Sequence, residues 1–300
     1  MNYETFINEI ISYFQDRLPE GRCARRQTMV KNNHVVYEGI TVCGSEITIS
    51  PSIYLESFFE EYEKGTSFDR VAGEVYDFYL QYESVTCEED FRPRDYDWVR
   101  EHLVMQLVNY EKNRELLKEM PSVPFMDLAI IFACLTNVGK EQGFFKIRNE
   151  HLAIWNITPQ KLYEDARRAS PVMYPEKVFP VEDFLPPEMR EIMEEEVQNR
   201  PRLLVLTNRQ KSMGASVVCY EGFLQKLYAR EGKSFYLIPA STHEMLALLS
   251  EEEGLADDVN RMIRDVNRDM VCEEEYLSDH AYYYDGQKDE LISCQYKMVI

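Results

Sequence analysis

The sequence contains few glycines and lacks the glycine-rich motifs that bind nucleotides. Its 12 glycines never form G-x-G-x-x-G or G-x-x-x-x-G-K-[ST], the two patterns whose backbone amides surround phosphate groups. A G-x-S-x-G turn for a nucleophilic serine is also missing, because Ser216 in Gly214-Ala215-Ser216 is followed by two valines. These absences exclude the common nucleotide-binding and serine-hydrolase motifs, while a site assembled from distant segments stays open.

Paired cysteines and long apolar runs are absent as well. The seven cysteines are scattered singly and include no C-x-x-C pair, a usage typical of a reducing cytoplasm. The first 20 residues contain Glu4, Glu9 and Asp16 among their apolar positions, so they do not resemble a secretion signal. The longest apolar run, 128–135, is far shorter than the ~20 residues that a membrane span needs. We therefore expect a cytoplasmic protein with no membrane segment, no metal site and no cofactor.

Basic residues are outnumbered by acidic ones, 33 to 53, which gives a net charge of −20. Much of the excess lies in the runs Glu194–Glu196, Glu251–Glu253 and Glu273–Glu275. Because Lys and Arg supply most of the affinity for phosphate backbones, we do not expect direct nucleic-acid binding. The charge favours a basic protein partner, and an acidic mimic of nucleic acid is an alternative.

Hydrophobic periodicity predicts an α+β protein. Apolar residues at helical spacing over 3–14 predict an N-terminal helix, and alternation over 26–49 predicts a β-hairpin. Two helices over 53–83 and a third over 95–119 would form a helical middle. The C-terminal part is expected to form a mixed β-sheet with helices.

Prolines suggest how the chain is divided. Six of the 13 prolines lie within 171–201, where they favour an extended connector. We therefore predict an N-terminal α+β lobe over 1–170, a proline-rich connector over 171–201 and a C-terminal α+β lobe over 202–300. In the last lobe, 203–207, 216–220 and 235–238 are predicted strands, and 255–270 is an amphipathic helix.

Several segments together resemble an uncharacterised bacterial domain-of-unknown-function family (family 5688). The resemblance spans most of the chain and implies a bacterial, cytoplasmic setting but no mechanism. The segments that carry it are Lys31–Gly39 (KNNHVVYEG), Ile49–Leu55 (ISPSIYL), Asn109–Asn113 (NYEKN), Asp127–Ile130 (DLAI), Trp155–Thr158 (WNIT), Leu206–Asn208 (LTN) with Gly214 and Ala215, Ile238–Glu244 (IPASTHE) and Leu277–His280 (LSDH).

The string from Ser241 to Glu244 is the most suggestive for chemistry. A zinc protease would need H-E-x-x-H, but Ala247 stands where the second histidine is required. The same residues spell a helix capping box, in which Ser241 and Glu244 satisfy backbone amides. Alternatively, His243 with Glu244 could act as a general base.

Other candidates lie in turns and at strand ends. Asp279 and His280 form a carboxylate–imidazole pair, although adjacent residues on a strand would point to opposite faces. Asn208 and Lys211 could meet an anionic ligand, or they could simply shape a hairpin. Asp127 could be a buried acid with a raised pKa, or a residue that caps the following strand.

Three functions are compatible with this sequence. The leading hypothesis is a non-enzymatic binding or regulatory protein whose acidic surface meets a basic protein. The alternatives are a small-molecule enzyme or sensor, with a cleft near His243, Asn208 and His280, and an acidic nucleic-acid mimic.

Overall fold

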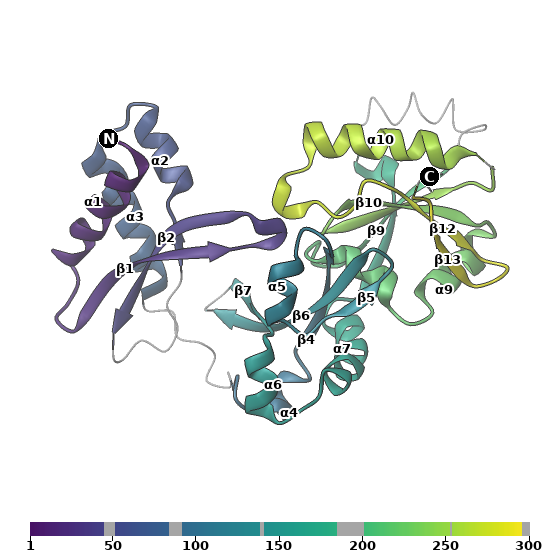
Figure 1. The fold of residues 1–300 in the computed structure, drawn as a ribbon, viewed down its shortest axis with the longest axis horizontal. Coiled ribbons are helices and arrows are strands. Elements are labelled where there is room, and N and C mark those ends of the chain that lie inside the picture. Colours follow the sequence, from purple (N-terminus) through teal and green to yellow (C-terminus); the bar gives the residue numbers. More distant parts are fainter. Residues whose placement is uncertain (45–51, 84–91, 139–140, 185–200, 253, 296–300) are drawn as a thin grey trace. The chain divides into compact units, whose positions relative to one another are not determined.

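The chain forms two compact units (Figure 1). The computed structural model describes residues 1–44, 52–83, 92–138, 141–184, 201–252 and 254–295. The first unit comprises Met1–Phe91 and Thr136–Gly143, and the second comprises Arg92–Leu135 and Phe144–Ile300. The division therefore differs from the predicted lobes, 1–170 and 202–300, and does not fall in the predicted connector 171–201.

The first unit is a three-stranded antiparallel sheet with helices. Its elements are α1 (Tyr3–Gln15), β1 (Arg22–Val30), the 3-10 helix η1 (Asn32–His34), β2 (Val36–Gly44), β3 (Ile53–Tyr54), α2 (Glu56–Glu63) and α3 (Phe68–Glu83). Asn2 caps α1 by accepting a hydrogen bond from the Thr5 N–H group, and the apolar stripe of α1 is buried. The predicted N-terminal helix is confirmed, and so is the hairpin up to residue 44, with sheet order β1-β2-β3. Residues 45–49 of the hairpin prediction lie outside the described residues.

The second unit contains two further sheets. Its first elements are α4 (Tyr96–Val99), β4 (Leu103–Asn109), α5 (Arg114–Glu119), β5 (Val123–Phe125), β6 (Leu128–Val138), β7 (Glu141–Lys146), α6 (Asn149–Trp155), α7 (Pro159–Met173), β8 (Glu176–Pro180) and η2 (Val181–Phe184). They are followed by β9 (Leu203–Asn208), η4 (Gly214–Cys219), α9 (Phe223–Glu231), β10 (Phe235–Ser241), β11 (Glu244–Leu249), α10 (Leu255–Met270), η5 (Glu273–Glu275), β12 (Tyr282–Asp285) and β13 (Glu290–Ser293). The ends of β6 and β7 that lie within 136–143 belong to the first unit.

The predicted α+β class is confirmed, and the largest sheet is antiparallel rather than mixed. Its order is β13-β12-β10-β11-β9-β8, and β4, β5, β6 and β7 form a second sheet. Because β8 pairs with β9, and α7 packs on β4, the segment that begins the predicted connector belongs to the same unit as the C-terminal strands. The rest of that connector, 185–200, lies outside the described residues.

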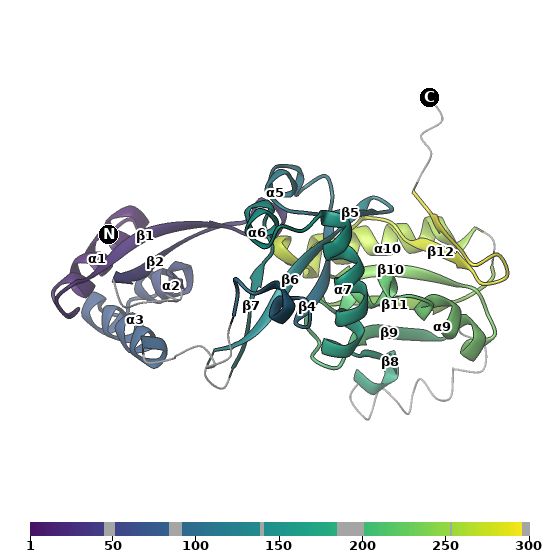
Figure 2. The same ribbon diagram turned by 90° about the horizontal axis from the view of Figure 1, so that it is seen from below.

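The six-stranded sheet is covered on both faces (Figure 1 and Figure 2). Phe235 and Leu237 of β10 point into the large core, which also contains residues of α7, α9 and the four-stranded sheet. Tyr236 and Ile238 point to the opposite face, against α10. This alternation is the period of two expected for a strand whose two faces are both buried.

Two local predictions were wrong. The predicted helix over 95–119 consists of α4, the strand β4 and α5, because β4 is buried along its whole length and so lacks the alternation that marks a half-buried strand. Of the predicted strand over 216–220, residues 216–219 lie in the 3-10 helix η4, since a short apolar run does not distinguish a strand from a helix. Among the described residues, no helix is long and apolar enough to cross a membrane.

Candidate functional site

The candidate residues from the C-terminal strands lie along one edge of the six-stranded sheet. Strand β9 ends at Asn208, and its antiparallel partner β11 begins at Glu244, with Leu206 paired to Met245. The loop after β9 therefore lies beside the β10–β11 turn that contains His243. The main-chain N–H of Ala215 donates to the carbonyl of Thr242 and joins the two.

Asn208 is fully buried, and its side chain hydrogen-bonds to the backbone of its own loop. Its Oδ1 accepts hydrogen bonds from the N–H groups of Gln210 at 3.0 Å and Ser212 at 3.3 Å, and its Nδ2 donates to the Ser212 carbonyl at 2.6 Å. These bonds hold a turn in which Lys211 and Met213 adopt positive φ angles of 54° and 53°. Asn208 therefore shapes the loop, and Lys211 is exposed to solvent together with Arg209 and Gln210.

His243 lies in a tight hairpin turn, so the predicted capping box is wrong. Ser241 ends β10 and accepts a hydrogen bond from the His243 N–H at 3.0 Å, whereas Glu244 begins β11. A hydroxyl bonded two residues ahead is a turn motif that competes with a helix start.

Both ring nitrogens of His243 have partners. Nδ1 accepts a hydrogen bond from the Met213 N–H at 3.2 Å, and Nε2 lies 3.4 Å from Oε1 of Glu275. A neutral ring that accepts at Nδ1 carries its proton on Nε2, where it faces the carboxylate. A general base needs a free lone pair, so His243 in this arrangement orients the turn and does not present one to a substrate.

His280 belongs to a different polar group, here named the Asp127 cluster. It consists of Asp127, Ser278, His280, Tyr282 and Ser293. The His280 ring contacts Ser278 Oγ through Nδ1 at 3.0 Å, and through Nε2 it contacts Ser293 Oγ at 3.1 Å and Asp127 Oδ1 at 3.4 Å. Asp127 also accepts from Tyr282 Oη at 2.6 Å and from Ser278 Oγ at 3.2 Å.

The imidazole of His280 and the hydroxyl of Ser278 in the Asp127 cluster are closed to a substrate, although the Asp127 side chain is 32% exposed. His280 and Ser278 are buried, with 6% and 2% of their surfaces exposed, so the serine hydroxyl cannot attack an external group in this state. Asp127 precedes β6, and the other members belong to or flank β12 and β13. The cluster thus ties the four-stranded sheet to the edge of the six-stranded one.

Asp279 and its neighbour His280 contact different residues. Its exposed carboxylate accepts a hydrogen bond from Asn267 Nδ2 of α10 at 2.9 Å. The pair precedes β12, so it is not part of the strand that the sequence suggested. The two histidines also have separate partners: Met213 and Glu275 contact His243, and the Asp127 cluster contains His280.

The pKa of Asp127 is lowered, which makes the alternative of a raised pKa wrong. Burial of the carboxyl group by itself raises its pKa. Hydrogen bonds to His280 and Tyr282, together with the favourable charge interaction with His280, outweigh that effect. Asp127 is therefore ionised at neutral pH and stabilises the fold in that form.

Asp127→Asn should destabilise the second unit by about 1 kcal/mol at about pH 7. A carboxyl whose folded pKa is depressed contributes its stability above the unfolded pKa and loses it as the pH falls through the folded pKa. The difference between wild type and variant should therefore shrink below about pH 4. Urea titration followed by tryptophan fluorescence measures this, because Trp98 and Trp155 both lie in the second unit.

Exposed Asp97 provides the matched control for that measurement. Asp97→Asn should leave the urea midpoint almost unchanged at both pH values, because exposed ion pairs contribute little. If Asp127→Asn loses the same stability at both pH values, packing and not the charge of Asp127 holds the cluster together.

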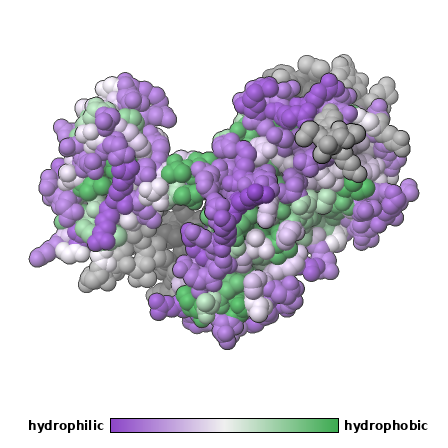
Figure 3. Space-filling model, in the orientation of Figure 1, coloured by the Kyte–Doolittle hydropathy of each residue, from purple (hydrophilic) through white to green (hydrophobic). Residues whose placement is uncertain are grey.

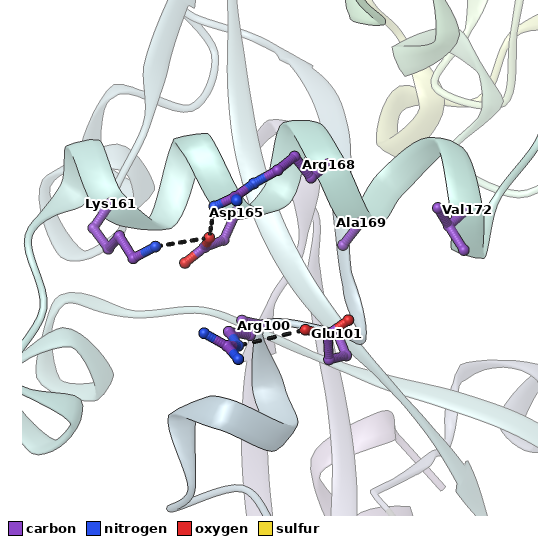
Figure 4. Close-up of a pocket in the computed structure, with 7 residues that line it drawn as sticks. All are labelled: Arg100, Glu101, Lys161, Asp165, Arg168, Ala169 and Val172. Atoms are coloured by element: carbon purple, nitrogen blue, oxygen red, sulfur yellow. Dashed lines mark hydrogen bonds and ion pairs between the residues drawn. The ribbon is translucent and has the colours of Figure 1, made fainter.

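A further group was missed among the sequence candidates. An open pocket of about 310 Å³ lies beside α7 and is lined by Arg100, Glu101, Lys161, Asp165, Arg168, Ala169 and Val172 (Figure 4). The signal was present in the sequence, since Lys161, Asp165 and Arg168 recur at the four- and three-residue spacing of one helix face. Within the described residues, no group of three or more His, Cys, Asp or Glu side chains could hold a metal ion.

Comparison with known proteins identifies a family but no activity. No curated protein and no solved structure matches the chain. A family model covers nearly its whole length, from residue 3 to residue 286, and is described as a family of unknown function. That match agrees with the resemblance carried by segments such as Lys31–Gly39 and Ile238–Glu244. The chain therefore belongs to the family of unknown function DUF5688.

Proposed function

We propose that this protein is a non-enzymatic binding or regulatory protein of the bacterial cytoplasm, which binds a basic amphipathic segment of a protein partner along α10. The observation that carries the proposal is an exposed apolar stripe on this helix. The acidic runs at both ends of α10 supply the complementary charge. The free cysteines among the described residues support a reducing compartment.

The apolar face of α10 is only half covered. Val259 and Ile263 are buried against the six-stranded sheet. Val266 and Met270 continue the same face, yet they are 41% and 82% exposed, and neighbouring Met262 is 51% exposed. Exposed apolar side chains that line up on one helix face commonly mark an interaction surface, and methionine adapts well to a partner's shape.

The remaining surface of α10 is charged but internally paired. Arg261 pairs with Asp258, and Arg268 pairs with Asp265 and Asp269. In the view of Figure 3 the surface over α10 is mainly hydrophilic. These pairs leave little net charge on the helix itself, so the charge that a partner meets comes from its two ends.

Acidic residues stand beyond both ends of α10. Glu251 and Glu252 precede the helix and are exposed, while Glu273–Glu275 follow it. In this second run, Glu273 pairs with Lys112, and Glu275 lies 3.4 Å from the His243 ring. A segment with apolar residues for the stripe and Lys or Arg at its flanks fits both features.

The alternatives have less support. An enzyme or sensor centred on His243, Asn208 and His280 would need accessible polar groups, whereas these three side chains hydrogen-bond to the protein itself. An acidic nucleic-acid mimic would need a row of unpaired carboxylates, and the acids of α10 are largely paired with arginines.

A labelled synthetic peptide tests the proposal. The peptide carries leucines at helical spacing among lysines, and a second peptide has the same composition in scrambled order. Fluorescence anisotropy should show tighter binding of the patterned peptide. Val266→Ser combined with Met270→Ser should weaken that binding by about tenfold, because two apolar contacts are lost.

Two exposed apolar residues outside α10 serve as the matched control. Ile154→Ser combined with Phe144→Ser alters side chains that are also well exposed, and it should leave binding unchanged. If both peptides bind equally and the α10 variant behaves as wild type, the attraction is purely electrostatic and the proposed surface is excluded.

A further inference from the structure

The pocket beside α7 has a positive balance of charge, although the chain as a whole is acidic. Its lining contains three cationic side chains, Arg100, Lys161 and Arg168, against two acidic ones, Glu101 and Asp165. The local balance is therefore +1, while the whole chain carries −20. Figure 4 shows Lys161 and Arg168 on α7, with Arg100 and Glu101 across the opening.

Asp165 is the acceptor that positions the cationic side chains of this pocket. Its side chain is only 4% exposed, and it accepts hydrogen bonds from Lys161 Nζ at 3.0 Å, from Arg168, and from Tyr96 Oη at 2.8 Å. Burial tends to raise the pKa of this carboxyl, but the hydrogen bonds from Lys161 and Tyr96 and the two cations lower it. Asp165 is thus a buried carboxylate that holds two cations on one helix face.

The two walls of the pocket are held together by the same group. Tyr96 begins α4, and Arg100 follows the end of that helix, so the Tyr96–Asp165 hydrogen bond also positions Arg100. Helix α7 is anchored to β4, since Ser170 Oγ accepts from the Met105 N–H at 3.0 Å. Binding groups fixed by such contacts before a ligand arrives lose little entropy on binding.

The Asp165 carboxylate does not use all the hydrogen-bond donors of Lys161 and Arg168. Lys161 has three N–H donors and Arg168 has five, and contacts with Asp165 and with the Glu164 carbonyl use only some of them. On the opposite wall, Arg100 contacts the exposed carboxylates of Asp97 and Glu101 at 3.3 and 3.4 Å. Exposed pairs at such distances are weak and are readily exchanged for a better acceptor.

We propose that this pocket binds the phosphoryl group of a small phosphorylated metabolite. The phosphoryl oxygens lie between Arg100 on one wall and Lys161 and Arg168 on the other, and the organic part rests on Ala169 and Val172. A dianion with three acceptor oxygens matches donors that converge from three side chains. Glu101 is 72% exposed and competes for Arg100, so a bound phosphoryl group displaces it.

Inorganic phosphate is the probe, and two neighbouring variants should act in opposite directions. Arg100→Gln removes a cation that does not contact Asp165, and it should weaken phosphate binding by about tenfold. Glu101→Gln removes the competing carboxylate and should tighten binding several-fold. Titration calorimetry at about 0.15 M salt measures both, because charges beyond about 8 Å are then largely screened.

A second pocket supplies the control. It is lined by Glu176, Lys177, Val178, Phe223, Lys226, Leu227 and Arg230. Lys226→Gln should leave phosphate binding unchanged; a loss there in place of the loss at Arg100 would overturn the assignment. The proposal also fails if wild type shows no saturable binding at millimolar phosphate, or if citrate binds and phosphate does not. These outcomes are independent of the α10 surface, which the phosphate titration does not involve.

Discussion

Tyr282→Ala is expected to lower the free energy of unfolding of the second unit by about 3–5 kcal/mol, the range found for buried aromatic side chains. Tyr282 is completely buried at the start of β12, within the large core cluster. Its removal leaves a cavity and takes away the short hydrogen bond to Asp127. Urea unfolding followed by the fluorescence of Trp98 and Trp155 measures the loss.

Tyr282→Phe separates packing from hydrogen bonding at this position. Phenylalanine keeps the ring in the core and removes only the hydroxyl, so the expected loss is about 1 kcal/mol. Equal losses for the two variants would mean that the hydrogen bond to Asp127, and not burial of the ring, dominates at this site. That result would contradict the packing argument.

Gly214→Ala should lower the free energy of unfolding by about 3 kcal/mol, at the upper end of the range for overpacking. Gly214 begins η4 beside the β10–β11 turn. A methyl group there would overlap Thr207 Oγ1 and the carbonyl oxygen of His243. Thr207 donates to that same carbonyl at 2.8 Å, so neither neighbour can move without breaking the bond. Urea unfolding monitored by tryptophan fluorescence is again the measurement.

Gly73→Ala is the matched glycine control. Gly73 lies within α3, where an added methyl group would approach Tyr13 Oη at 3.8 Å and no other atom of the described residues within 4 Å. Alanine favours a helix over glycine, so this variant should be neutral or more stable by up to about 1 kcal/mol. Circular dichroism is the appropriate signal, since both tryptophans lie in the other unit. A similar loss for the two glycine variants would argue against a local clash at Gly214.

Helices with one buried face and one solvent-exposed face were predicted well from the sequence. The helix at 3–14 and the amphipathic helix at 255–270 have clear stripes, and both are present as α1 and α10. Strand β4 was missed because burial on both sides removes the polar alternation. The start of the predicted connector contains the paired strand β8, because prolines reveal local extension but not strand pairing, and Val178 pairs with Leu206 across 28 residues.

The candidate residues could be located only in part. The topology brought Asn208 and His243 to one edge, yet their hydrogen-bond partners come from residues such as Met213 and Glu275 that carry no sequence motif. The contact between Asp127 and His280 joins residues more than 150 positions apart, which no spacing rule reveals. In contrast, Lys161, Asp165 and Arg168 stand within two helical turns, so their charge pattern can be recognised in the sequence itself.

The interleaving of the two units in the sequence has a consequence for synthesis on the ribosome. Residues 136–143 belong to the first unit, but they are translated after β4, β5 and most of β6 of the second. The amino-terminal unit therefore cannot be complete when its own first 91 residues emerge. Its last piece arrives only once part of the second unit has been made, so the two units are expected to mature together and not in simple amino-to-carboxyl order.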